Sequence, residues 1–333
     1  MTKFSKKLTV ITLFYNRSEV VEQTINSLLK QEFQDFDIIA VDDGSTDSTL
    51  YELNKINADN FYVVTHENLG FTSSLISILG EVKSDYIAIH GSGDTCSRDK
   101  LSKQIEILEQ NANVGFCGTT SENLSPLTRE VIDIQSYNKL SLTAIDFQSA
   151  PPFTHGSVMF RRSIYDLVGG YDSRFTFSQD WDLWLRMLRE SKGYMILEPL
   201  YQRYILPDGA SFNPIKAEKQ LIFKHLALLF DKRAGADRNE LLAGDVISKN
   251  RVLFHNELKK DLVNRLFKLI LLGHTEHYVV LKDYVYGTYG VPSSFLAEKM
   301  LLILEVMGRC NISLRGIGKV ARYTLERVRR RVS

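Results

Sequence analysis

The sequence predicts an α/β protein with a mainly parallel sheet flanked by helices, followed by a helical C-terminal region. Three observations support this fold class. Apolar strand-like runs alternate with helical patterns through about the first 200 residues. Polar residues follow the ends of several of these runs, and strand patterns stop beyond residue 214. We therefore expect two regions, residues 1–212 with the sheet and residues 213–333 with helices.

Each strand is predicted from a short apolar run that ends in polar or turn-forming residues. Such runs occupy residues 8–15, 36–41, 61–65, 86–89, 113–117, 156–160 and 194–197. Apolar residues at helical spacing predict helices at 19–30, 72–82, 97–110 and 180–190, with Ser97 as the N-cap of the third. Residues 119–150 lack clear periodicity, so no element is predicted there.

Composition limits the class of protein. Hydrophobic residues make up 44% of the 333 residues, enough for a sizeable core. The net charge of +1 argues neither for nor against a nucleic-acid partner. Cys96, Cys117 and Cys310 lie far apart, which suits reduced thiols in the cytoplasm. No apolar run reaches the ~18 residues of a spanning helix, and we expect the basic N-terminus to begin a strand rather than a cleaved signal.

Polar clusters follow three of the predicted strands: Tyr15-Asn16-Arg17, Asp42-Asp43 and Gly91-Ser92-Gly93-Asp94. Ligands of open parallel sheets bind beyond the carboxyl ends of the strands. Taken alone, the acidic pair with Gly44 and Ser45 is also typical of a turn. The convergence of all three clusters on one sheet edge favours a nucleotide-type pocket.

Seven segments then follow one another at spacings that resemble family 2 glycosyltransferases of the GT-A fold. They are VITLFYNR, IIAVDDGSTDST, HENLG, YIAIHGSGD, HGSVMFRRS, VGGYD and QDWDLWLR. The resemblance covers roughly residues 7–210, and the C-terminal third carries no motif that we can place.

The resemblance implies that the first two strand ends, with Tyr15, Asn16 and Arg17 in the first, hold the nucleotide. Tyr15 would offer an aromatic face to the base, although it could equally be a core tyrosine at a strand end. Asp42 or Asp43 would accept a hydrogen bond from the base, with Asp43 favoured, and a ring N–H of uracil would suit this acceptor.

The third strand is followed by Asn68-Leu69-Gly70, which resembles the family's Asn-x-Gly turn, so Asn68 and Gly70 join the predicted nucleotide site. Leu75-Ile76 stands where the family often has Arg-Asn or Leu-Asn. One usual donor contact is therefore missing.

The fourth strand of the family usually ends in Asp-Ala-Asp-Asp, a cluster that binds a divalent cation. Here the positions hold Gly91, Ser92, Gly93 and Asp94. Asp94 with a bound diphosphate would give a weaker Mn²⁺ or Mg²⁺ site, and Gly93 would let the backbone approach the phosphates.

A second departure concerns the Tyr-Arg-x-His segment that the family shows before a proline. Leu206 takes the place of the histidine, and Arg203 could neutralise phosphate charge. We therefore expect metal dependence to be weakened or lost.

Asp180 in the segment QDWDLWLR is the candidate general base. It would take a proton from the acceptor hydroxyl as that oxygen attacks the anomeric carbon and inverts its configuration. Its alternative role is that of a helix N-cap, which is compatible with catalysis. His155 could contact the donor or acceptor, or be a core histidine with all its hydrogen bonds made.

Two tryptophans and an aspartate on the same predicted helix have a structural alternative. Trp181 and Trp184 could line the acceptor pocket, but packing of a helix against the core is the commoner role. Asp182, two residues after Asp180, faces elsewhere and is predicted to be structural.

Residues 311–333 carry seven Lys and Arg against Glu326, a net charge of +6. An amphipathic helix of this kind could lie on an anionic membrane surface. It could instead be a solvated helix that packs on residues 295–307, as in a homo-oligomer. The segment lacks the interleaved aromatics typical of nucleic-acid binding, so we expect no nucleic-acid partner.

The sequence thus predicts an inverting glycosyltransferase that moves a sugar from a nucleotide-sugar donor, a UDP-sugar, to a saccharide or lipid-linked saccharide hydroxyl in surface polysaccharide or glycan synthesis. We expect it in the cytoplasm or peripherally on the cytoplasmic membrane face. The alternative is a GT-A-like binding or scaffold protein without turnover. A nucleotidyltransferase is less suited, because the first loop lacks the Gly-rich, basic character of triphosphate sites.

Overall fold

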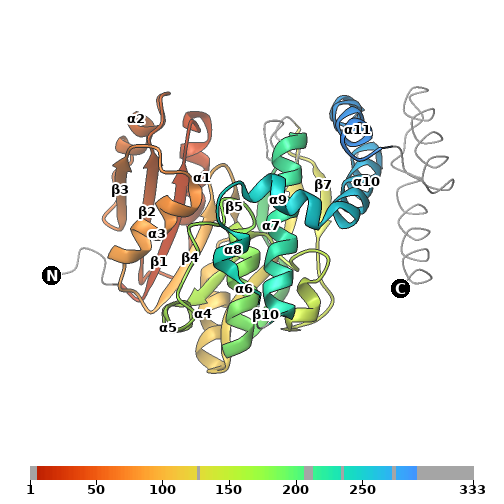
Figure 1. Cartoon of the computed structure of the whole chain (residues 1–333). Coiled ribbons are helices and arrows are strands. Elements are labelled where there is room, and N and C mark those ends of the chain that lie inside the picture. The colour runs from red at the N-terminus through yellow and green to blue at the C-terminus, as the bar shows by residue number, and fades with distance from the viewer. Residues whose placement is uncertain (1–5, 126–127, 206–212, 234–235, 272–274, 291–333) are drawn as a thin grey trace. The chain divides into compact units, whose positions relative to one another are not determined.

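The computed structural model describes residues 6–125, 128–205, 213–233, 236–271 and 275–290 (Figure 1). The strands are β1 (Leu8–Phe14), β2 (Phe36–Asp43), β3 (Phe61–His66), β4 (Tyr86–Gly91), β5 (Thr95–Cys96), β6 (Val114–Leu124), β7 (Val131–Gln135), β8 (Ser141–Leu142), β9 (Met159–Arg161) and β10 (Lys192–Tyr204). The α-helices are α1 (Val21–Leu29), α2 (Thr49–Asn54), α3 (Phe71–Glu81), α4 (Lys100–Gln110), α5 (Arg162–Leu167), α6 (Gln179–Glu190), α7 (Pro214–Lys232), α8 (Arg238–Leu241), α9 (Val246–Leu253), α10 (His255–Leu271) and α11 (Thr275–Tyr289). The 3-10 helices are η1 (Ser18–Val20), η2 (Ala144–Phe147) and η3 (His155–Ser157). The predicted α/β class with C-terminal helices is confirmed.

The sheet has the strand order β3-β2-β1-β4-β9-β6-β10-β5, with β7 beside β6 and β8 beside β10. Strands β1, β2, β3 and β4 pair in parallel, as do β6 and β10. The short strand β9 is antiparallel to both β4 and β6. The carboxyl ends of the parallel strands therefore share one edge of the sheet, and β9 begins at that same edge.

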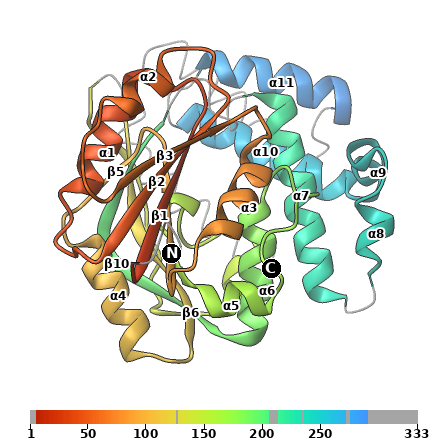
Figure 2. The same ribbon diagram turned by 90° about the vertical axis from the view of Figure 1, so that its left-hand side faces the viewer.

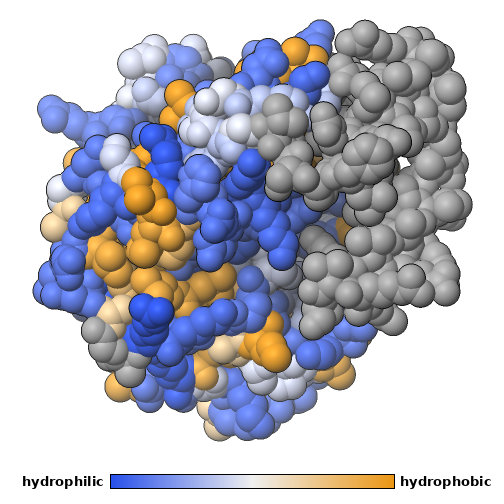
Figure 3. All heavy atoms as spheres, turned by 45° about the vertical axis from the view of Figure 1, so that its right-hand side comes forward, coloured by the Kyte–Doolittle hydropathy of each residue, from blue (hydrophilic) through white to orange (hydrophobic). Residues whose placement is uncertain are grey.

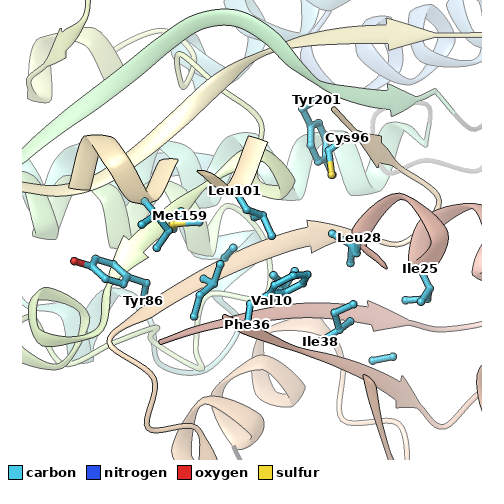
Figure 4. Packing of buried hydrophobic residues seen from close by; sticks show 14 of the residues in the cluster. Val10, Ile25, Leu28, Phe36, Ile38, Tyr86, Cys96, Leu101, Met159 and Tyr201 are labelled. Carbon is cyan, nitrogen blue, oxygen red and sulfur yellow. The ribbon is translucent and has the colours of Figure 1, made fainter. Parts of the chain in front are cut away.

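Strand β1 is buried along its whole length, as expected for a central parallel strand covered on both faces. Leu8, Val10 and Phe14 belong to one buried cluster with residues of α1, α2 and α4. Figure 4 shows Val10 in this cluster with Ile25 and Leu28 of α1 and Leu101 of α4. Figure 2 shows α1 and α3 on either side of the strands β1 to β3. Alternation of side chains along one strand thus supplies two separate cores.

The prediction that Ser97 caps the helix of residues 97–110 is wrong. Helix α4 begins at Lys100, with Asp99 at its N-cap and no side-chain cap hydrogen bond. The chain before it forms β5, which pairs with β10 at the edge of the sheet, and the Ser97 amide continues this pairing by donating to the Leu200 carbonyl (3.0 Å). Strand pairing therefore delays the start of the helix.

Residues 119–150, for which no element was predicted, contain regular structure. Strand β6 runs on to Leu124 between β10 and β7, and β8 pairs with β10. The end of β6 has no apolar sequence pattern, because its buried residues Thr119, Thr120 and Ser121 are polar. Hydrogen bonding to neighbouring strands defines this segment more than hydrophobic alternation does.

The chain divides into two compact units. One contains Met1–Leu206 and Leu226–Arg238, and the other contains Pro207–His225 and Asn239–Ser333. Among the described residues, no helix is both long and apolar enough to cross a membrane. Polar and charged side chains cover much of the face in Figure 3, where apolar side chains gather in a patch. The basic segment 311–333 lies outside the described residues.

Two glycines provide a matched test of the packing. A Cβ on Gly118 in β6 would meet ring carbons of the buried Phe153 at 2.2 Å, whereas a Cβ on Gly80 in α3 would have no atom within 4 Å. We expect Gly118→Ala to lower the free energy of unfolding by about 1–3 kcal/mol through overpacking. Gly80→Ala should raise it by about 0.5–1 kcal/mol through helix propensity.

Urea denaturation of both variants measures these changes. Equal effects of the two substitutions would show that β6 does not pack against Phe153 as described.

Candidate functional site

The first two strand ends are tied together by hydrogen bonds. Asn16 has a positive φ of 51° directly after β1, and its Oδ1 accepts from the Thr46 amide (2.8 Å). The Arg17 amide donates to Oγ1 of Thr49 (2.8 Å). Tyr15 is 48% exposed at the same edge, so its ring is available to stack on a planar ligand.

Asp42 and Asp43 end β2 and are both almost fully buried. Successive strand residues point to opposite faces, so the two carboxylates do not share a pocket. Asp42 accepts from the Ser45 amide (3.3 Å) and from Oγ1 of Thr65 on β3 (3.0 Å). This carboxylate joins the β2 end to its own loop and to the adjacent strand.

Asp43 holds the turn that precedes α3. Its carboxylate accepts from the amides of Leu69 (2.8 Å) and Gly70 (3.1 Å) and from Oγ of Ser74 (2.6 Å). The Asn68 side chain donates to the Asp43 carbonyl (2.9 Å). A carboxylate has about four acceptor positions, so little capacity remains for a nucleotide base.

Asp94 lies beyond the end of β4 and is the single carboxylate of residues 86–96. Its oxygens accept from the Tyr201 hydroxyl (2.6 Å) and the Tyr204 amide (3.1 Å), both on β10. Burial raises the pKa of Asp94 to about 6, against the opposing effects of the Tyr201 hydrogen bond and the Arg203 charge. The exposed Arg203 is therefore close enough to act on this carboxylate.

Small residues make room for the Tyr201 hydroxyl. It also accepts from the Gly91 amide (3.0 Å), and a Cβ on Gly91 would lie 2.9 Å from its oxygen. A Cβ on Gly156 would lie 2.0 Å from the same oxygen. Any side chain at position 91 or 156 would displace the hydroxyl.

The backbone groups of Gly93 make hydrogen bonds within the protein. Its amide donates to Oγ1 of Thr24 (2.8 Å), and its carbonyl accepts from Nε2 of Gln23 (2.6 Å). Its positive φ of 99° is one that glycine adopts without strain. The predicted approach of this backbone to phosphates would have to use other atoms of the loop.

The residues near Asp94 do not fit a divalent-cation cage. Both oxygens of the carboxylate already accept protein hydrogen bonds. Within the described ranges, His, Cys, Asp and Glu side chains form no group of three that could hold a metal ion. Leu206, at the family's histidine position, lies outside those ranges. We therefore derive no chemical step through a metal.

Asp180 is placed differently from the other carboxylates. It lies in the first turn of α6, after Ser178, which has a left-handed φ of 50° and is the N-cap. One oxygen accepts from the Trp181 amide (2.9 Å), and the other accepts no hydrogen bond from the described residues. The alternative that Asp180 is the N-cap is wrong, and one carboxylate oxygen remains for a ligand proton.

His155 begins η3, just before β9, and lies close enough to Asp180 to be affected by its charge. Burial lowers the pKa of His155, and the Asp180 charge acts in the opposite direction. Nε2 of His155 is 2.7 Å from the Tyr171 hydroxyl, and the ring packs against Phe71, with centroids 5.7 Å apart. Phe71 is 43% exposed, so an aromatic surface borders this part of the site.

Comparisons with known proteins agree with this arrangement. The model described as Glycosyl transferase family 2 matches residues 9–169. The putative glycosyltransferase EpsE of Bacillus subtilis (strain 168) is 30% identical over 204 residues, which cover 59% of this chain and 72% of EpsE. The chain belongs to glycosyltransferase family 2. The putative teichuronic acid biosynthesis glycosyltransferase TuaG of the same strain is 28% identical over 230 residues, 67% of this chain and 88% of TuaG.

Solved structures show the fold of this glycosyltransferase. Mannosyltransferase PcManGT from Pyrobaculum calidifontis, in complex with GDP-Man and Mn²⁺, superposes with a TM-score of 0.58 at 15% identity, covering 97% of this chain and 86% of that one. S. aureus TarS 1-349 in complex with UDP-GlcNAc gives a TM-score of 0.57 at 15% identity, with 91% of each chain covered. The predicted GT-A fold is confirmed.

The glycosyltransferase also contains residues that local pattern did not select. Tyr201 holds Asp94, and Thr24 holds Gly93. Each lies far in sequence from its partner, so no local motif indicates it. Trp184 is fully buried among phenylalanines, which supports its packing role. Asp182 is 2% exposed and paired with Arg186 (2.7 Å), as expected for a structural residue.

The raised pKa of Asp94 makes a testable contribution to stability. A folded-state pKa of about 6, above the ordinary value near 4, means that the folded enzyme binds a proton more tightly than the unfolded chain does. This contribution is complete below about pH 4 and is lost as the pH rises through 6. Asp94→Asn, which stays neutral, should therefore gain on the order of 1–3 kcal/mol relative to wild type between pH 4 and pH 8.

Unfolding of both proteins by urea across this pH range measures the difference. Parallel stability profiles would show that the surroundings of Asp94 do not raise its pKa as described.

Proposed function

We propose that this glycosyltransferase transfers a sugar from a UDP-sugar to a hydroxyl of a saccharide or lipid-linked saccharide in surface polysaccharide or glycan synthesis, with inversion and with Asp180 as the general base. The observation that carries the proposal is the hydrogen-bond state of Asp180. Asp42, Asp43 and Asp94 each have both oxygens engaged by protein donors, whereas Asp180 retains one oxygen without a donor among the described residues.

The geometry supports the following sequence of events. The nucleotide lies across the ends of β1, β2 and β3, where Tyr15 is exposed and where the resemblance assigns Asn16, Arg17, Asp42, Asp43, Asn68 and Gly70. The acceptor hydroxyl donates to Asp180, which removes its proton as the oxygen attacks the anomeric carbon opposite the departing UDP.

The structural neighbours make a nucleotide-sugar donor the natural substrate class. TarS is described with UDP-GlcNAc and PcManGT with GDP-Man and Mn²⁺. UDP is proposed here because a carboxylate acceptor suits the ring N–H of uracil. Asp42, with two protein donors, has more spare acceptor capacity than Asp43 and becomes the better candidate for this contact.

Asp180→Asn tests the base. Loss of the proton acceptor should lower kcat by roughly 10²–10⁴-fold, while donor binding changes little because Asp180 does not contact the nucleotide. Glu190→Gln is the matched control, an exposed carboxylate at the other end of α6. Release of UDP from the bound UDP-sugar, with water or added methyl glycosides as acceptor, gives kcat. Retained turnover in folded Asp180→Asn would exclude this role.

A second prediction concerns the diphosphate. We propose that Arg203, exposed and next to Asp94, neutralises it in place of a tightly held cation. Calorimetry with UDP-, GDP- and dTDP-sugars should show binding of a UDP-sugar that EDTA weakens only slightly. Arg203→Gln should weaken it about tenfold or more, as expected for a charged hydrogen bond.

Lys192→Gln, at the opposite end of β10, is the control and should leave affinity unchanged. Binding that requires Mn²⁺ and is abolished by EDTA would contradict the proposal and indicate that Asp94 and the diphosphate together hold a cation.

A further inference from the structure

The segment Leu226–Arg238 lies beyond the matched family region yet groups with the sheet-containing unit. Its last residue, Arg238, contacts two aspartates that flank the loop before α6. The guanidinium donates to Oδ2 of Asp172 (3.1 Å) and to Oδ1 of Asp182 (2.9 Å). Asp182 is 2% exposed and the Arg238 side chain is 27% exposed, so the aspartate end of this ion pair is removed from water.

Aromatic rings complete the environment of Arg238. Its guanidinium lies over the ring of Phe230 at 4.6 Å and over that of Phe175 at 5.4 Å. Phe175 belongs to the loop between Asp172 and α6, and its carbonyl accepts from Oγ1 of Thr72 on α3 (2.8 Å). The loop is therefore held from α3 on one side and from Arg238 on the other.

This loop determines where Asp180 lies. It passes through Ser178, whose left-handed φ of 50° is uncommon for a residue with a Cβ. Asp180 follows in the first turn of α6, two residues before Asp182. A single guanidinium nitrogen, Nη2, that donates to both ends of the loop limits rotation and fraying of this first turn.

We propose that Arg238 is a positioning residue that fixes Asp180 for proton transfer by joining Asp172 to Asp182. The inference rests on the proposed role of Asp180. It assigns a part in the reaction to a segment outside the matched family region, and it predicts that the sheet unit needs residues 226–238 for full turnover.

The test compares two arginines that join α6 to the same segment. Arg189, near the end of α6, donates to the Phe230 carbonyl (2.8 Å), about 13 Å along the helix from Asp180. In the full-length protein, Arg238→Met should lower kcat for UDP release by on the order of 10- to 100-fold, with the KM for the UDP-sugar little changed. Arg189→Met should leave kcat within about twofold, although either change can lower the melting temperature.

Arg238→Lys retains the charge but not the planar group that lies over the rings of Phe230 and Phe175, so it should restore part of kcat. If Arg238→Met does not fold, Arg238→Lys and Asp172→Asn carry the same test. Equal kcat for the Arg238 and Arg189 variants, or a loss of activity that follows only the unfolded fraction, would overturn the proposal.

Hydrogen exchange separates this inference from the proposed function. Amides of residues 178–183 should exchange faster in Arg238→Met than in wild type and Arg189→Met, whether or not the enzyme turns over. Unchanged exchange there would overturn the positioning role while leaving Asp180→Asn to judge catalysis. Faster exchange together with an active Asp180→Asn variant would instead show that the helix start is held by Arg238 but that Asp180 is not the base.

Discussion

The hydrogen bond from the Tyr201 hydroxyl to Asp94 is the constraint on which the centre of the site depends. Tyr201 is fully buried on β10, and its hydroxyl also accepts from the Gly91 amide at the end of β4. The tyrosine thus joins strands on opposite sides of β9. A Cβ at position 156 would meet the hydroxyl, and a Cβ at position 91 would meet both the Asp94 carboxylate and the hydroxyl, so both positions favour glycine. The absence of a side chain at position 91, within the reduced acidic cluster, is therefore linked to the packing of the buried tyrosine.

The reversal of β9 explains how residues distant in sequence meet. Ala88 near the end of β4 pairs with Met159 at the start of β9. The 3-10 turn of His155–Ser157 therefore lies at the same sheet edge as Asp94. The chain then passes through α5 and the loop after Asp172 to reach α6, which returns Asp180 to His155. The antiparallel strand β9, which lies between β4 and β6, thus brings the two halves of the site together.

The local sequence pattern was sufficient to locate the strands that are apolar and buried. The runs at β1, β2 and β4 are apolar and buried, so their ends, with Tyr15, Asp42 and Asp94, could be located from the sequence. The local pattern failed where pairing with distant strands decides where an element begins or ends. The start of α4 depends on the pairing of β5 with β10, and the end of β6 is a strand of buried polar residues. Neither feature has a local hydrophobic signal.

Side-chain roles were harder to predict than positions, because a carboxylate at a strand end can bind a ligand or serve the fold. Asp43 illustrates the second case, since Leu69, Gly70 and Ser74 occupy most of its acceptor capacity and hold the start of α3. Its partners lie 26 or more residues away, and only the folded chain reveals them. Asp180 differs because its neighbours in sequence place it in a first helical turn with few protein donors near it.

The contrast between these carboxylates also indicates how the proposed base stays free of protein hydrogen-bond donors that would weaken it. A base that accepted hydrogen bonds from several protein donors would be a weaker proton acceptor, because each donor stabilises the anion. The fold therefore assigns its donors to Asp42, Asp43 and Asp94, which organise loops, and holds α6 through Asp182 and its two arginines instead. Asp182 and its arginines hold the start of the helix, so that one oxygen of Asp180 can accept the proton of the acceptor hydroxyl.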